Sequence, residues 1–174
     1  PGDTEKPLIT GLSGEAGDTT SKTSINENLT AVGTFTANET VTWSLTSGAD
    51  IGKFSINSSS GALSFKSSPD YETPTDSDSN NDYVVTVRAS DTAGNTSDQT
   101  VTVSVADVDE ANPSITGPSG SAGDSTSSKT IQENSTAVHT FTANETVTWS
   151  IDGGADQSKF SINQSTGALA FKAA

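Results

Sequence analysis

Acidic side chains gather at four places in this chain, and their grouping is the feature most able to support chemistry. The residues are Glu27, Asp70, Glu72, Asp91, Asp107, Asp109 and Glu110. Carboxylates held close together without a cation repel one another and lose hydration, which is costly. Ca²⁺ takes about six to eight oxygen ligands, and carboxylates with backbone carbonyls supply them. The grouping therefore allows a cation site, and acids that simply hydrate loops remain the alternative interpretation.

The elements that must position these acids are short strands. Apolar residues alternate with Thr and Ser in brief runs, and β-branched and aromatic types are frequent in them, which is typical of half-buried strands. The predicted strands cover residues 8–10 (continuing near 24–25), 32–37, 41–45, 54–56, 62–66, 83–89 and 100–105. Gly61 is predicted to take positive φ in the hairpin turn at 57–61. We expect an all-β fold, a seven-stranded Greek-key β-sandwich.

The inward-facing residues follow from the same alternation, and Trp43 is predicted to be a core anchor. The expected core comprises Ile25, Val32, Phe35, Trp43, Leu45, Phe54, Ile56, Leu63, Phe65, Val85, Val87, Val101 and Val103. Because strand ends alternate between the two poles of a sandwich, Glu27, Asp70, Glu72 and the segment after residue 105 should share one pole. Asp91 should lie at the opposite pole.

A tandem repeat defines the organisation of the chain. Residues 34–44 recur without change at 140–150, and 42 of 62 positions are identical when 7–68 is aligned with 113–174. We predict the end of a preceding linker at 1–6, a complete module at 7–112 and a partial second module at 113–174. The second module lacks counterparts of the strands at 83–89 and 100–105, so its sandwich should stay open and be marginally stable.

Composition excludes several classes of protein. The net charge of −14 repels phosphate, which argues against a nucleic-acid partner. The sequence contains no apolar run of about 20 residues for a membrane helix, so we expect no direct membrane insertion in this segment. It has no Cys and a single His, His139, whose repeat counterpart is Gly33. With the acids at module poles rather than in a cleft, we expect no enzyme.

The motifs I-N-E-N, D-Y-E, A-S-D and D-V-D-E-A-N-P, in that order, resemble the calcium-binding motifs of the cadherin repeat. The likeness is greatest to cadherin-like repeats of large bacterial secreted or surface proteins. The resemblance implies Ca²⁺ ligands at Glu27, Asp70, Glu72, Asp109 and Glu110, the Val108 carbonyl as a backbone ligand, Asp107 as a further candidate, and Asp91 at the opposite pole. The chain departs from the family at 37–39 and 143–145, where Ala-Asn-Glu replaces D-x-D, and in the linker, where Asp-Glu-Ala replaces Asn-Asp-Asn.

The resulting hypothesis is a calcium-binding, cadherin-like module of a bacterial cell-surface or secreted adhesin. Ca²⁺ would rigidify module junctions, with affinity in the range of about 10⁻⁴ to 10⁻³ M. Expected partners are neighbouring modules of the same chain, and identical chains or surface glycans and proteins, at an extracellular or cell-surface location. The alternative is a carbohydrate-binding or accessory module of a secreted enzyme. It requires exposed aromatic residues, for which Tyr71 and Tyr83 are the candidates.

Overall fold

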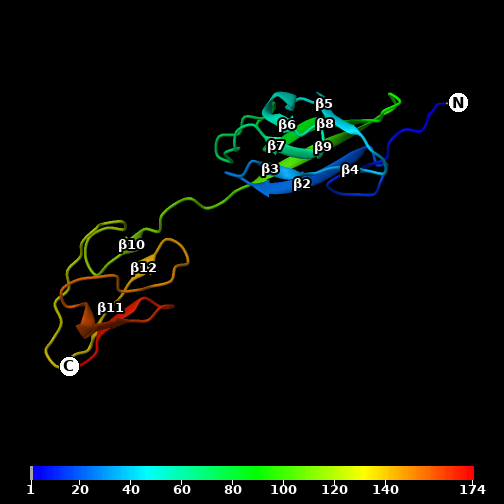
Figure 1. The fold of residues 1–174 in the computed structure, drawn as a ribbon. Helices are drawn as coiled ribbons and strands as arrows, with labels where there is room; N and C mark the ends of the chain where they lie inside the picture. Colours follow the sequence, from blue (N-terminus) through cyan, green and yellow to red (C-terminus); the bar gives the residue numbers. More distant parts are fainter. Residues whose placement is uncertain (1) are drawn as a thin grey trace. The chain divides into compact units, whose positions relative to one another are not determined.

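A computed structural model describes residues 2–174 and divides the chain into two compact units (Figure 1). Unit 1 ends at Asp109 and unit 2 runs over Glu110–Ala174. Both are built from short strands and single 3₁₀ turns. None of the helices in the part of the chain that the structure describes has the length and apolar character of a membrane span.

Unit 1 is a two-layered β-sandwich. Its strands are β1 (Ile9–Thr10), β2 (Thr20–Asn26), β3 (Ala31–Thr34), β4 (Thr36–Ala37), β5 (Thr42–Ser47), β6 (Phe54–Ile56), β7 (Ala62–Phe65), β8 (Asp82–Ser90) and β9 (Thr96–Ala106), with a 3₁₀ turn, η1, at Ile51–Lys53. One layer has the order β2-β9-β8-β5 and the other β3-β7-β6. The predicted first strand is divided into β1 and β2, and the second into β3 and β4. The remaining predicted strands are confirmed, so the all-β sandwich prediction holds.

The pairing of β2 with β9 determines where the acids can meet. These two strands run parallel in register from Thr20↔Thr100 to Asn26↔Ala106, whereas the other pairs in the two layers are antiparallel. The residues that follow β2 and those that follow β9 therefore emerge at the same end of the sandwich. We call this end the C-terminal pole; β8 ends at the other, N-terminal pole.

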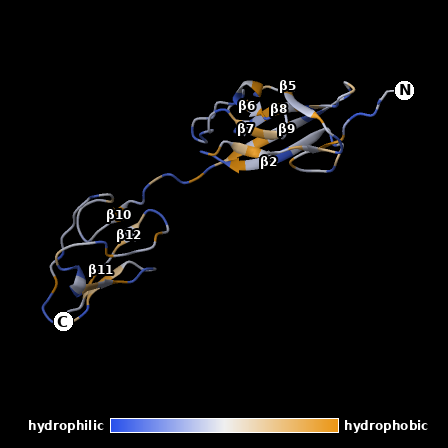
Figure 2. Ribbon diagram, viewed as in Figure 1, coloured by the Kyte–Doolittle hydropathy of each residue, from blue (hydrophilic) through white to orange (hydrophobic). Residues whose placement is uncertain are grey.

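The core lies between the two layers and largely matches the predicted residues. Burial alternates strictly along β8 and along the second half of β9, as expected for strands with one covered face. Of the predicted core, Ile25, Val32, Leu45 and Ile56 are partly buried against it and the others are buried. Ile9, Tyr83, Ala89 and Val105 are additional core members. Figure 2 shows hydrophobic residues along the central strands of unit 1.

The candidacy of Tyr83 as an exposed aromatic is wrong. The side chain is 1% exposed, because it lies on the same face of β8 as Val85 and Val87. Its ring packs edge-on against Phe65 at a centroid distance of 5.0 Å. Its hydroxyl accepts a hydrogen bond from the Thr75 N–H at 3.1 Å. Tyr83 therefore fills the core and offers no stacking surface to a sugar.

The predicted turn at Gly61 is confirmed. Gly61 has φ 75°, and a Cβ there would lie 2.6 Å from the Phe35 carbonyl oxygen. The Gly61 carbonyl also accepts a hydrogen bond from the Phe35 N–H at 3.0 Å. Left-handed backbone and close approach together require glycine at this position.

Unit 2 forms fewer strands than the matching part of unit 1. They are β10 (Ile115–Thr116), β11 (Ala137–Thr140), β12 (Thr142–Ala143), β13 (Phe160–Ile162) and β14 (Ala168–Phe171), with a 3₁₀ turn, η2, at Gln157–Lys159. They pair as β10-β12 and β11-β14-β13. Residues 148–153, the counterpart of β5, form no strand. In unit 1 β5 pairs with β8, whereas residues 148–153 pair with no strand within unit 2.

Candidate metal-binding sites

Three carboxylates converge at the C-terminal pole of unit 1. Glu27, Asp70 and Glu72 each offer an oxygen, and these atoms lie within 4.8 Å of one another. Glu27 directly follows β2, and the other two belong to the segment after β7. The convergence of segments separated by more than forty residues follows from the sandwich, since both leave their strands at this pole.

Glu27 is the centre of this cluster. It is 2% exposed, its Oε2 accepts a hydrogen bond from the Tyr71 N–H at 2.8 Å, and its Oε1 accepts one from the Val108 N–H at 2.8 Å. These hydrogen bonds, that of Tyr71 foremost, hold the pKa of Glu27 below its usual value, although burial opposes them. Glu27 is therefore ionised at neutral pH and joins the D-Y-E segment to the segment that leaves β9.

The pKa of Glu72 reflects the repulsion between the carboxylates of this cluster. A hydrogen bond from its own backbone N–H lowers its pKa, but burial and the negative charges of Glu27, Asp107 and Asp70 together raise the pKa above its usual value. Asp70 is oriented by the Thr73 N–H, which donates to its Oδ1 at 3.0 Å. Negative charge is thus concentrated here without a cationic neighbour in the cluster, which favours binding of a cation.

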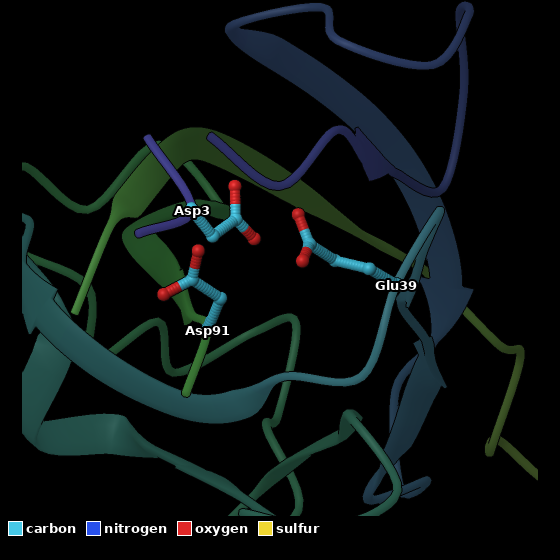
Figure 3. A group of neighbouring side chains, drawn as sticks. All are labelled: Asp3, Glu39 and Asp91. Carbon is cyan, nitrogen blue, oxygen red and sulfur yellow. The ribbon is translucent and has the colours of Figure 1, made fainter. Parts of the chain in front are cut away.

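A second group of three carboxylates lies at the N-terminal pole. Oxygens of Asp3, Glu39 and Asp91 also lie within 4.8 Å of one another. Figure 3 shows the three carboxylates facing a common space from three separate parts of the chain. Asp3 comes from the N-terminal segment, Glu39 from the connection between β4 and β5, and Asp91 from the residue after β8.

In the N-terminal group, hydrogen bonds orient Asp91 and nearby negative charges act on Glu39. Asp91 accepts hydrogen bonds from the Asn95 side chain at 2.7 Å and the Asn95 N–H at 2.8 Å, which together lower its pKa. The same Asn95 amide donates to the Asp3 carbonyl at 3.2 Å. Burial, followed by the charges of Asp3, Asp91 and Glu5, raises the pKa of Glu39.

The structure distributes the predicted site residues over both poles. Glu27, Asp70 and Glu72 come together, and Asp91 lies at the opposite pole with Asp3 and Glu39. Val108 contacts Glu27 through its amide, and Asp107 lies near enough to act on the pKa of Glu72. Within the described residues, Asp107, Asp109 and Glu110 are exposed and stand outside the three-carboxylate groups. Sequence reasoning did not propose Asp3 or Glu39 as ligands, although Asp3 occupies the repeat register of Asp109 and Glu39 recurs as Glu145.

The donor sets fit a hard cation. Ca²⁺ binds oxygen at about 2.3–2.6 Å, so two oxygens on one ion stand at most about 5.2 Å apart. The spacing within both groups meets this limit. All three donors are carboxylates in each case, and neither group contains a nitrogen or sulfur ligand. This chemistry suits hard cations such as Ca²⁺, Mg²⁺ or Mn²⁺ rather than metals that prefer nitrogen or sulfur ligands.

Comparison with known proteins agrees with the fold. Residues 23–106 match the Cadherin domain family, which comprises extracellular adhesion modules known to bind Ca²⁺. The matched residues lie within unit 1, which is therefore similar to a cadherin domain over that stretch. No curated protein matches the sequence.

Solved cadherin structures resemble the chain at low identity. Mouse cadherin-23 EC22-24 is 21% identical, covers 97% of this chain and 54% of its own, with a TM-score of 0.43. Human CDH23 EC21-23 is 22% identical, with 97% and 55% covered and a TM-score of 0.46. The protocadherin gammaB7 EC3-6 cis-dimer structure is 21% identical, with 97% and 39% covered and a TM-score of 0.49. The chain thus spans about half the length of the two cadherin-23 structures.

Proposed function

We propose that unit 1 is a Ca²⁺-binding module of a bacterial cell-surface or secreted adhesin. The observation that carries the proposal is the pair of three-carboxylate groups, one at each pole, built from segments far apart in the sequence. At the C-terminal pole, Glu27, Asp70 and Glu72 would hold the ion. At the N-terminal pole, Asp3, Glu39 and Asp91 would do so.

The chain's own hydrogen bonds give bound Ca²⁺ a mechanical role. Glu27 already joins the residue after β2 to Tyr71 and to Val108, which belongs to the segment that leaves the module. A cation there supplies positive charge that offsets the repulsion between Glu27, Asp70 and Glu72. Residues 107–109 would then be held against the pole, and the connection between consecutive modules would stiffen.

The carbohydrate-binding alternative has less support than the calcium hypothesis. Its two aromatic candidates reduce to Tyr71, which is 38% exposed, because Tyr83 is buried. The Tyr71 backbone is moreover bonded to Glu27. Tyr71 therefore belongs to the carboxylate cluster rather than to a separate sugar platform.

Calorimetric titration of the full chain with CaCl₂ tests the proposal, and its pH dependence gives a directional prediction. A carboxyl group must be ionised to bind Ca²⁺, and groups with raised pKa values are protonated first as the pH falls. The pKa values of Glu39 and Glu72 are both raised. We expect Ca²⁺ to bind at pH 7. Its affinity should begin to fall at a higher pH than it would for ligands of ordinary pKa, which protonate at about pH 4.

The control is a titration with MgCl₂, which should give weaker binding because Mg²⁺ sheds its water reluctantly. A loss of Ca²⁺ affinity that begins only where Asp and Glu of ordinary pKa become protonated, at about pH 4, would contradict the assignment of Glu39 and Glu72 as ligands.

A further inference from the structure

Asn81 lies next to the C-terminal pole and is neither an acid nor a member of the carboxylate cluster. It immediately precedes β8 and has φ 66°, in the left-handed region. Its backbone is fixed on both sides: its N–H donates to Asp76 Oδ1 at 3.3 Å, and its carbonyl accepts from the Val105 N–H at 2.9 Å. Asn81 is thereby tied to the end of β9.

The side chain of Asn81 reaches the middle of the D-Y-E motif. Its Nδ2 donates to the Tyr71 carbonyl oxygen at 3.0 Å. On the other side of the same residue, the Tyr71 N–H donates to Glu27 Oε2 at 2.8 Å. The two peptide groups that flank Tyr71 are the ones that connect it to Asp70 and Glu72. Tyr71 is thus held from two directions, once by a proposed ligand and once by Asn81.

The orientation of the Asn81 amide is set by this contact. The Tyr71 carbonyl can only accept a hydrogen bond, so the NH₂ group must face it. The Asn81 Oδ1 is buried and has no hydrogen-bond partner within residues 2–174. A buried acceptor without a partner costs free energy and stabilises nothing. The favourable interaction of the side chain therefore comes from the bond to Tyr71.

Asn81 lies in a loop that is held by hydrogen bonds to Asp76. Asp76 is 6% exposed, and its Oδ2 accepts a hydrogen bond from the Asn80 N–H at 2.9 Å in addition to the Asn81 contact. A chain of hydrogen bonds therefore runs from Asp76 through Asn81 and Tyr71 to Glu27. The loop before β8 acts on the carboxylate cluster without contributing a carboxylate to it.

We propose that Asn81 is a positioning residue for the cluster at the C-terminal pole: its amide holds the Tyr71 carbonyl and thereby keeps Asp70 and Glu72 facing Glu27. This inference rests on the proposed Ca²⁺ function and adds a residue outside its ligands. Ca²⁺ affinity at this pole then depends on a side chain that does not bind the ion. In other metal sites, residues that hydrogen-bond to the ligands affect metal affinity in the same way.

The test compares Asn81→Gly with Ser79→Gly in the full chain. Glycine adopts the left-handed conformation readily, so Asn81→Gly removes the amide without straining the backbone. Ser79 is the matched control, because it lies in the same loop, is exposed and has φ 58°. An Asp91→Asn background weakens the N-terminal group, so that the titration reports the C-terminal pole.

Two readouts separate this inference from the proposed function. In the metal-free protein, hydrogen exchange of the Tyr71 amide is expected to accelerate in Asn81→Gly and to stay unchanged in Ser79→Gly. In a CaCl₂ titration, Asn81→Gly is expected to bind about 10-fold more weakly than its parent and Ser79→Gly equally well.

Each outcome has a distinct meaning. If the parent binds Ca²⁺ and Asn81→Gly binds it with the same affinity, the positioning role is overturned. If the parent binds no Ca²⁺, the proposed function fails, and the exchange rate of the Tyr71 amide alone decides whether Asn81 holds this segment.

Discussion

Replacing Glu27 with alanine is expected to weaken Ca²⁺ binding at the C-terminal pole strongly and to lower the thermal midpoint of unit 1 even without metal. The carboxylate accepts hydrogen bonds from Tyr71 and Val108 and lies among the three converging oxygens. Alanine leaves both N–H groups without their acceptor and releases two segments at once. We expect at least about a 10-fold loss of Ca²⁺ affinity at this pole, measured by calorimetric titration.

The chain carries its own control for this experiment at Glu133. This residue occupies the same repeat position in the motif I-Q-E-N, but it is exposed, whereas Glu27 is buried and bonded to Tyr71 and Val108. Glu133→Ala should leave both the Ca²⁺ titration and the melting curve of unit 1 unchanged. Equal losses from the two substitutions would mean that Glu27 acts through net charge alone rather than through its contacts.

Phe35→Ala is expected to destabilise unit 1 by about 3–5 kcal/mol, the range for truncating a fully buried phenylalanine. The side chain is 1% exposed and lies in the core beside Trp43, with ring centroids 6.0 Å apart. Phe141→Ala removes the same side chain from the identical sequence block in unit 2. There the ring lies 6.0 Å from Trp149, but it is only half-buried. We expect a clearly smaller loss of stability from Phe141→Ala.

Urea unfolding followed by tryptophan fluorescence measures both effects. A Trp149→Phe background makes the signal report unit 1, and a Trp43→Phe background makes it report unit 2. Losses of equal size in the two units would show that unit 2 has a closed core, contrary to the half-buried environment of Phe141 and Trp149.

The fold was predictable where local pattern and burial agree. Val85 and Val87 alternate with polar residues, so their inward direction is visible in the sequence, and the same alternation places Tyr83 beside them in the core. Tyr83 was a candidate surface aromatic because of its residue type, but its position in the strand indicates the core. Residues 42–47 show the limit of local pattern. They form β5 in unit 1, whereas the closely similar segment 148–153 forms no strand, because strand formation requires a partner.

The candidate site was predictable only in part. Glu27, Asp70 and Glu72 could be placed at one pole because strand ends alternate between poles. Asp3 and Glu39 could not be paired with Asp91 in the same way. Asp3 lies outside any predicted strand, and Glu39 stands where the D-x-D motif of the cadherin repeat is missing. The contact between Asn81 and Tyr71 depends on the path of an irregular loop, for which the sequence carries no periodic signal.

Thermal unfolding of the full chain tests most directly whether the two groups of carboxylates bind Ca²⁺. Melting curves are recorded in millimolar CaCl₂, in the same concentration of MgCl₂ and in excess chelator. A ligand that binds only the folded state stabilises it, and each 1 kcal/mol raises the midpoint of a domain of this size by about 4–8 °C. We expect a rise of several degrees with Ca²⁺ that Mg²⁺ does not reproduce. Identical midpoints in all three solutions would contradict this expectation and would mean that the acids at the poles only hydrate the loops.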